Sequence, residues 1–150
     1  MSKVSPKGHR RFSGAALAGI TPEMRIRALV VEDEAGARDL LRQVLEDEGF
    51  QVDIAVDGEK AIGFLANNSY DIVLLDMVLP RVSGADVMEH LLCTKPQVLE
   101  KIIVVTGVPL DEVRKLFPTV PRVLSKPVIP SRVLQLIRER VERGRRFSVA

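Results

Sequence analysis

The sequence predicts an α/β fold built on a doubly wound parallel sheet, and three observations lead to this prediction. Short, continuous apolar runs recur along the chain, as expected for parallel strands that are buried on both faces. Segments with apolar residues at helical spacing alternate with these runs, and the connections are short. Hydrophobic residues make up 46% of the chain but aromatic residues only 4%, so the core must be mostly aliphatic.

Five segments are predicted as strands. Four of them are continuous apolar runs that lead into a charged or hydroxyl residue. The other, residues 50–55, shows only partial alternation of apolar and polar residues. In chain order the predicted strands cover residues 28–31, 50–55, 72–75, 102–105 and 123–125.

Five helices are predicted to alternate with these strands. Residues 34–48 carry apolar side chains at helical spacing, and Gly49 is placed to end this helix as a C-cap glycine. Asp57-Gly58 can form a hairpin turn, but the helical spacing that follows favours the opening of a helix. The other helices are predicted over about residues 58–67, 84–95, 109–117 and 130–141. This alternation predicts a five-stranded sheet in the flavodoxin-like order 2-1-3-4-5, with helices on both faces.

The length of 150 residues fits one domain. We place it at residues 26–142, between a basic, flexible tail over residues 1–25 and a basic tail over residues 143–150. An export signal at the N-terminus is disfavoured because small and polar residues interrupt its apolar stretch. No run approaches the roughly 20 apolar residues of a membrane span, and the single cysteine, Cys93, favours a reducing compartment. We therefore expect a cytoplasmic protein without membrane insertion.

Both tails contain the sequence Arg-Arg-Phe-Ser, at residues 10–13 and 145–148. Coincidence between two basic segments explains this repeat more simply than a shared docking or phosphorylatable motif. Direct binding of nucleic acid is not expected, because no recognition-helix module follows the predicted domain. His9 and His90 are expected to be solvated side chains, and Cys93 a small apolar filler.

Charged and hydroxyl residues follow the predicted strands at the points where the strands end. Glu32 and Asp33 follow the first strand, Asp76 the third, Thr106 the fourth and Lys126 the last. The carboxyl ends of parallel strands form the site edge of an open α/β sheet, so these residues are expected to converge. Crowded carboxylates repel one another unless a cation neutralises them. Because all the ligands are oxygens, with no adjacent His or Cys, the set favours Mg²⁺.

The same residues suit the transfer of a phosphoryl group. Asp76 can act as a nucleophile towards phosphorus, Lys126 supplies a positive charge, and Thr106 supplies a hydroxyl donor. Each residue alone has an ordinary explanation: a helix cap, a surface lysine or a β-forming threonine. The acidic cluster can simply open a helix, where the dipole favours negative charge. Together, and each at a strand end, they favour a metal-assisted phosphoryl site.

Over about residues 26–142 the chain resembles the receiver domain of a two-component response regulator, similar to single-domain chemotaxis regulators. The specific part of the resemblance is the spacing of Asp76, Pro80 and Gly84 together with a Lys-Pro pair. Asp57-Gly58 matches a helix-opening turn that many such domains have. The matching motifs are Val30-Val31-Glu32-Asp33-Glu34, Asp76-Met77-Val78-Leu79-Pro80-Arg81-Val82-Ser83-Gly84, Val105-Thr106-Gly107 and Ser125-Lys126-Pro127.

The resemblance implies that Asp76 accepts phosphate from a sensor histidine kinase, a phosphotransfer protein or a small phosphodonor. It further implies that Asp33, Asp76 and the backbone carbonyl of Val78 bind Mg²⁺, and that Glu32 assists directly or through water. Thr106 would be the switch hydroxyl. Lys126 would be the lysine of the family, followed by a peptide bond that is often cis.

Two positions depart from the family pattern. Receivers usually have Tyr or Phe three residues before the lysine, where this chain has Val123, so the usual ring that couples to the switch hydroxyl is missing. Glu32 stands where Asp is commoner, and its longer side chain favours contact with the metal through water.

We therefore predict a phosphoacceptor that signals by contact with a separate target protein and has no attached output domain. It is not expected to be an enzyme, beyond assisting its own aspartyl phosphorylation and dephosphorylation. The closest alternative is a phosphorylation-independent scaffold, which the missing ring at Val123 favours and the intact site residues oppose. A phosphatase-like enzyme on a related fold is a third possibility, but it would need a substrate-covering insertion, and the connections are short.

Overall fold

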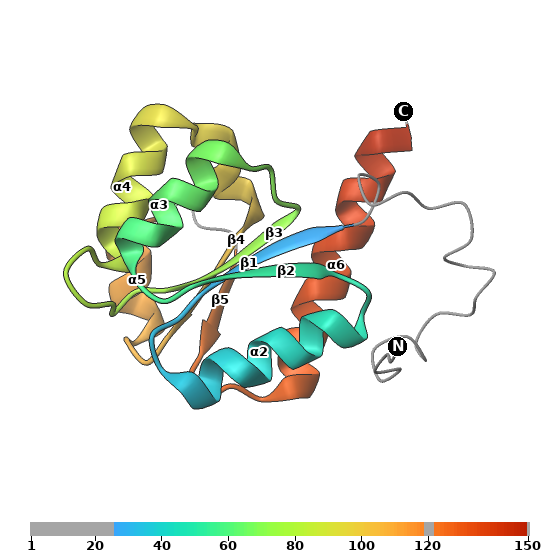
Figure 1. Ribbon diagram of the computed structural model, residues 1–150, viewed down its shortest axis with the longest axis horizontal. Coiled ribbons are helices and arrows are strands. Elements are labelled where there is room, and N and C mark those ends of the chain that lie inside the picture. The colour runs from blue at the N-terminus through green and yellow to red at the C-terminus, as the bar shows by residue number, and fades with distance from the viewer. Residues whose placement is uncertain (1–25, 119–121, 150) are drawn as a thin grey trace, which may run out of the picture.

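The computed structural model describes residues 26–118 and 122–149 of the chain (Figure 1). The predicted N-terminal tail and His9 lie outside these residues. Five parallel strands form one sheet in the order β2-β1-β3-β4-β5, which confirms the predicted fold class and strand order. The strands are β1 (Arg27–Val31), β2 (Gln51–Ala55), β3 (Ile72–Asp76), β4 (Ile102–Thr106) and β5 (Arg122–Ser125).

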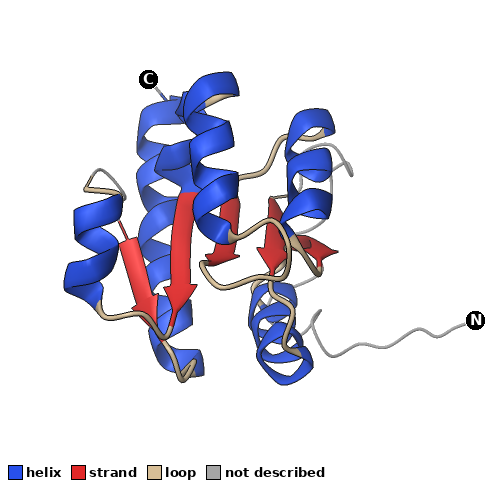
Figure 2. Cartoon of the chain, turned by 90° about the vertical axis from the view of Figure 1, so that its left-hand side faces the viewer, coloured by secondary structure: helices blue, strands red, loops and turns tan. Residues whose placement is uncertain are grey.

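Helices cover both faces of the sheet, as predicted (Figures 1 and 2). Helices α2 and α6 pack on one face, and α3, α4 and α5 pack on the other. The helices are α2 (Ala35–Asp47), α3 (Gly58–Asn67), α4 (Gly84–Thr94), α5 (Leu110–Leu116) and α6 (Pro130–Val149), and a 3₁₀ helix, η3 (Pro96–Lys101), precedes β4.

Alternation along the strands divides the interior into two aliphatic cores. Leu29 and Val31 of β1 contribute to the core under α3, α4 and α5, whereas Ala28 and Val30 contribute to the core under α2 and α6. Successive side chains of a strand point to opposite faces, so one continuous apolar run supplies both cores. Every residue of β3 and of β4 is buried, which is why these two strands were visible as unbroken apolar runs.

The helix ends follow local chemistry. Gly49 lies just past α2 with φ of 93°, a conformation that glycine adopts without strain, and this confirms it as the end of the helix. The Asp57 side chain accepts a hydrogen bond from the Lys60 N–H at 2.8 Å, so Asp57-Gly58 opens α3 and does not form a hairpin. Ser83 and Asp86 form a reciprocal capping box at the start of α4.

Three details of the helices differ from the expectations. The 3₁₀ helix η3 was not predicted, because it is short and lacks a repeated apolar spacing. Helix α6 continues to Val149, beyond the expected end at Val141, through a segment without proline and rich in the helix former Arg. Cys93 is exposed on α4, so its prediction as a buried filler was wrong, whereas His90 is exposed as expected.

None of the helices in the described part of the chain combines the length and the apolarity that crossing a membrane requires.

The burial pattern predicts that truncating Leu45 will destabilise the fold by about 2–5 kcal/mol, because it leaves a cavity under α2. Leu45 is fully buried, whereas Leu92 on α4 is 49% exposed and serves as a matched control. Leu45→Ala and Leu92→Ala should be compared with the native chain by urea unfolding. Equal losses of stability in the two variants would contradict the assignment of Leu45 to the core.

Candidate functional site

The predicted site residues lie at the carboxyl edge of the sheet. Val31 pairs with Leu75, so Glu32 and Asp76 follow at the ends of adjacent strands. Thr106 pairs with Ser125, which places Lys126 directly beyond the end of β5. Parallel register therefore brings together residues that are far apart in the sequence.

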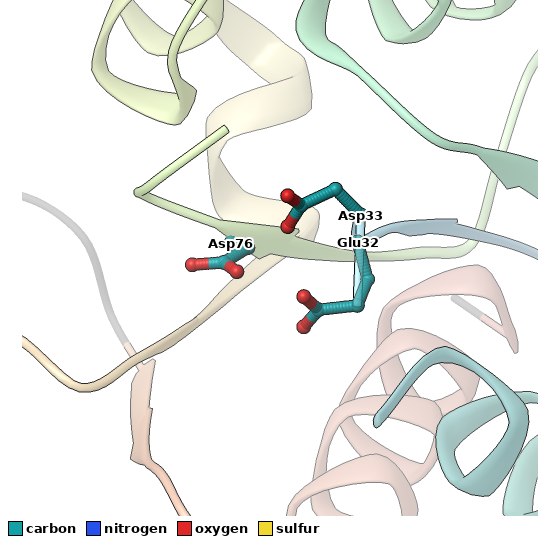
Figure 3. A group of neighbouring side chains, drawn as sticks. All are labelled: Glu32, Asp33 and Asp76. Carbon is teal, nitrogen blue, oxygen red and sulfur yellow. The ribbon is translucent and has the colours of Figure 1, made fainter. Parts of the chain in front are cut away.

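Three carboxylates form the centre of the site (Figure 3). One oxygen from each of Glu32, Asp33 and Asp76 lies within 4.8 Å of the others. Glu32 and Asp76 are buried, with 0% and 3% of their surface exposed, whereas Asp33 is exposed to solvent. The cluster is thus open on one side, and two of its charges lie in the protein interior, where an uncompensated charge is costly.

The Lys126 ammonium compensates part of this negative charge. Its Nζ lies 2.8 Å from Asp76 Oδ2 and 3.1 Å from Glu32 Oε1, and Glu34 Oε1 is 3.8 Å away. Burial alone would lower the pKa of Lys126, but the hydrogen bonds and charges of Asp76 and Glu32 outweigh it and raise the pKa above its ordinary value. The ammonium is therefore fixed as a cation between two buried carboxylates.

Glu32 is the least satisfied group of the cluster. Burial, followed by the hydrogen bond and charge of Asp76, raises its pKa to about 7, although Lys126 acts in the opposite direction. Its Oε1 atom is buried and accepts no hydrogen bond from the described residues, although Lys126 Nζ is close. A buried oxygen without a hydrogen bond next to two further carboxylates fits a hard divalent cation or one of its bound waters. The residues present are therefore suited to Mg²⁺.

The backbone after β3 holds the Asp76 carboxylate in place. The Val78 N–H donates to Asp76 Oδ1 at 3.0 Å, and the Gly84 N–H donates to the Met77 carbonyl at 3.0 Å. A Cβ at Gly84 would collide with the Asp76 carbonyl oxygen, so only glycine fits at the start of α4. With Lys126 on the other oxygen, both Asp76 oxygens have a defined partner.

Thr106 and Lys126 are linked through the backbone. The Lys126 N–H donates to the Thr106 carbonyl at 2.9 Å, and the fully buried Thr106 hydroxyl accepts a hydrogen bond from the Val108 N–H at 3.2 Å. Thr106 thus lies at the same sheet edge, with its hydroxyl held by the loop that follows β4.

The sequence profile of the response regulator receiver domain matches residues 28–138. The chain belongs to the response regulator receiver family. This receiver is 41% identical over 71 residues to response regulator MprA of Mycobacterium sp. (strain KMS) and 40% identical over 65 residues to the transcriptional regulatory protein DltR of Streptococcus agalactiae. The matched segments cover 47% and 43% of this chain, but only 31% and 29% of the two relatives.

Solved receiver structures share the fold. A CheY-like response regulator receiver domain protein of Methanospirillum hungatei JF-1 is 29% identical with a TM-score of 0.71, over 81% of this chain and 97% of that chain. The signal receiver domain of a putative Luxo repressor protein of Vibrio parahaemolyticus gives a TM-score of 0.72 over 83% and 96% of the two chains. Its identity is 24%, so this second likeness concerns the fold alone.

Two expectations drawn from the family pattern can be located in the receiver. The Lys126–Pro127 peptide bond is cis, as the resemblance implied. Val123, which replaces the usual ring, lies opposite Val104 and packs against the core under α3, α4 and α5. A half-buried aliphatic side chain thus occupies the position where receivers usually have the aromatic ring that couples to the switch hydroxyl.

Several residues near the site were not singled out from the sequence. Arg38 on α2 donates to the carbonyls of Glu32 and Asp33, at 3.3 and 3.2 Å, and so supports the acidic turn. Arg81 forms an ion pair with Asp57 at 2.9 Å. No sequence signal distinguishes these arginines from solvated ones, because their partners come from tertiary structure. An open hollow of about 520 Å³ beside the ammonium is lined by Glu34, Gly36, Ala37, Leu40, Lys126, Pro127 and Val128.

Glu32→Gln should change how the stability of the metal-free receiver depends on pH. Folding raises the pKa of Glu32 from 4.5 to about 7, so the folded state binds the proton more tightly than the unfolded chain. The stability from this group is fully present below pH 4.5 and is lost as the pH rises through about 7. Between about pH 5 and about pH 8, the free energy of unfolding of the native chain should fall by about 2 kcal/mol because of this group, and Glu32→Gln should not show this fall. Urea unfolding in the presence of EDTA measures both.

Glu46→Gln, at an exposed position of α2, is the matched control and should retain the native pH profile. If Glu32→Gln also retained that profile, the raised pKa of the buried carboxyl would be contradicted.

Proposed function

We propose that this receiver accepts a phosphoryl group on Asp76 in an Mg²⁺-dependent reaction, as the acceptor of a two-component phosphorelay. The observation that carries the proposal is the buried Asp76 carboxylate, which is held between the Val78 N–H and the Lys126 ammonium beside two further carboxylates. Such a cluster has little use in the fold itself, because replacing buried charges by apolar residues usually costs no stability.

Asp33, Asp76 and the Val78 carbonyl would hold Mg²⁺, with Glu32 directly bound or bridged by water. The cation, when bound, supplies charge neutralisation for the phosphoryl oxygens and for the crowded carboxylates. The proposal for Glu32 is supported by its buried Oε1 atom, which lacks a hydrogen bond from the described residues.

The reaction needs an in-line approach to Asp76 more than acid–base chemistry. One Asp76 oxygen forms a bond to phosphorus while the bond from phosphorus to the donor breaks, and the donor keeps the electron pair. Lys126 is close enough to Asp76 to pair with the phosphoryl oxygens. The Thr106 hydroxyl, whose oxygen accepts from the Val108 N–H, would donate its O–H to one of them. Attack of water on phosphorus later returns the Asp76 carboxylate, so the receiver assists only its own modification and its reversal.

The phosphodonor is proposed to be a sensor histidine kinase or a phosphotransfer protein. The hollow beside Lys126 supports this, because small and aliphatic residues of α2 and of the loop after β5 line it next to the site. A partner seated there would present its donor to the open side of the cluster, where Asp33 is exposed.

The output is proposed to be contact with a separate target protein. DltR is named a transcriptional regulatory protein, but the match covers 29% of it and the property belongs to that protein. A phosphorylation-independent scaffold is the second candidate, and Val123 in place of the usual ring is the observation that favours it.

Phosphorylation of Asp76 is tested by incubating the full chain with Mg²⁺ and a small phosphodonor and measuring the intact mass. We expect the addition of one phosphoryl group that resists acid and is lost in base. Asp76→Ala should abolish the adduct, because it removes the nucleophile. EDTA should slow its formation, because it removes the cation that neutralises charge on the phosphoryl oxygens. Asp47→Ala, on the surface of α2, should be phosphorylated like the native chain.

An adduct that survives Asp76→Ala would identify a different nucleophile. If the native chain formed no adduct with either a small donor or its cognate kinase, the scaffold would be the better description.

A further inference from the structure

Arg81 has an unusual backbone conformation in the loop that joins β3 to α4. Its φ is 62°, and it is the only non-glycine residue with positive φ in the described part of the chain. Residues with a Cβ avoid this region unless their surroundings impose it, and such outliers concentrate at functional sites. Arg81 follows Asp76 by five residues, so the outlier belongs to the loop that continues from the phosphoacceptor.

An ion pair with Asp57 accompanies this conformation. Arg81 Nη2 lies 2.9 Å from Asp57 Oδ2, and the Asp57 side chain is only 6% exposed. The other Asp57 oxygen accepts the Lys60 N–H at the start of α3, and this bond, assisted by the charge of Arg81, keeps the pKa of Asp57 below its ordinary value. Both oxygens of Asp57 are therefore fixed, one by the helix and one by the loop.

The next residues along each segment are also in contact. A Cβ at Gly58 would collide with the carbonyl of Val82, so the start of α3 and the end of the loop approach as closely as backbones can. Between Asp76 and this contact, Leu79 is buried in the core, while Val78 is exposed and donates its N–H to Asp76. The loop is thus held on both sides of Val78.

We propose that Asp57 and Arg81 form a positioning pair for the phosphoryl site: they hold the β3–α4 loop so that Val78 presents its N–H to Asp76 and its carbonyl to the bound Mg²⁺. Neither residue touches the reacting atoms. This inference rests on the proposed function, because it requires that the carboxylate cluster binds Mg²⁺. The pair itself lies outside that cluster.

The competing explanation is that the pair only stabilises the fold. The Arg81 side chain is 71% exposed, and ion pairs with so much solvent around one partner contribute little to stability. If the pair positions the loop, breaking it should lower the Mg²⁺ affinity more than it lowers the free energy of unfolding. If the pair only stabilises the fold, breaking it should lower the Mg²⁺ affinity only as far as it unfolds the protein.

Two substitutions remove the ion pair but preserve the backbone conformation of Arg81 and the helix cap of Asp57. Arg81→Asn removes the guanidinium but keeps a residue that tolerates positive φ, and Asp57→Asn removes the charge but keeps an oxygen that can cap α3. Arg81→Lys retains a cation on a long side chain and is the conservative rescue. Arg42→Gln is the matched control, because it breaks an exposed ion pair with Asp39, of 2.6 Å, elsewhere on the surface.

Mg²⁺ dissociation constants of the full-length, unphosphorylated chain are measured by following backbone amide signals during an NMR titration with Mg²⁺. Arg81→Asn and Asp57→Asn should each weaken binding by about tenfold, the lower end of the range for residues that orient ligands. The double variant should be no weaker than the worse single variant, because both changes remove one interaction. Arg81→Lys should stay within about twofold of native, and Arg42→Gln should match the native chain.

Two further measurements distinguish positioning from folding. In the metal-free chain, the Val78 amide should exchange its hydrogen several-fold faster in Arg81→Asn, while urea unfolding should match that of Arg42→Gln. The Mg²⁺ concentration for half-maximal phosphorylation should rise about as much as the dissociation constant, with a smaller change in the rate at saturating Mg²⁺. Native affinity in both Asn variants would overturn the positioning pair alone. Absence of Mg²⁺ binding by the native chain would overturn the proposed function together with it.

Discussion

The site depends on an imbalance of charge that the fold imposes at one edge of its sheet. Parallel pairing of β1 and β3 places Glu32 beside Asp76, and the Lys126 ammonium is the nearest positive charge to both. One ammonium cannot neutralise three carboxylates. Burial, followed by the hydrogen bond and charge of Asp76, therefore raises the pKa of Glu32 despite the nearby Lys126. The arrangement of the strands thus leaves an excess of negative charge that a further cation would balance, next to the carboxylate that we propose as the phosphoacceptor.

The sequence was most informative where the structure of an element follows from its own residues rather than from contacts with other elements. The unbroken runs of β3 and β4 predicted buried parallel strands, and the residues after them predicted which side chains would converge. The Asp57–Arg81 pair, the contacts of Arg38 and the unsatisfied oxygen of Glu32 could not be predicted, because each depends on where another element packs. The exposure of Cys93 was also missed, since the apolar spacing of α4 is compatible with more than one width of buried face.

Val123 bears on how the proposed phosphorylation of Asp76 would affect the rest of the molecule. The Thr106 hydroxyl is held by the Val108 amide, and Val123 packs with the aliphatic core under α3, α4 and α5. A rearrangement of Thr106 would move the loop that leads into α5 without the rotation of a ring. The proposed change would pass through the backbone or through repacking of aliphatic side chains, and packed cores respond to such changes in discrete steps rather than by gradual deformation.

The division of the interior into two cores by the sheet has a consequence for how such a protein can diversify. The hollow beside Lys126 is formed largely by α2 and the segment leading into α6, whereas Val123 and α5 belong to the opposite layer. Residues that share no contacts generally change stability independently. If the hollow binds the phosphodonor and the opposite layer responds to phosphorylation, as proposed, separate sets of substitutions could alter donor recognition and response. A new upstream partner could then be acquired without changes in the layer that contains Val123 and α5.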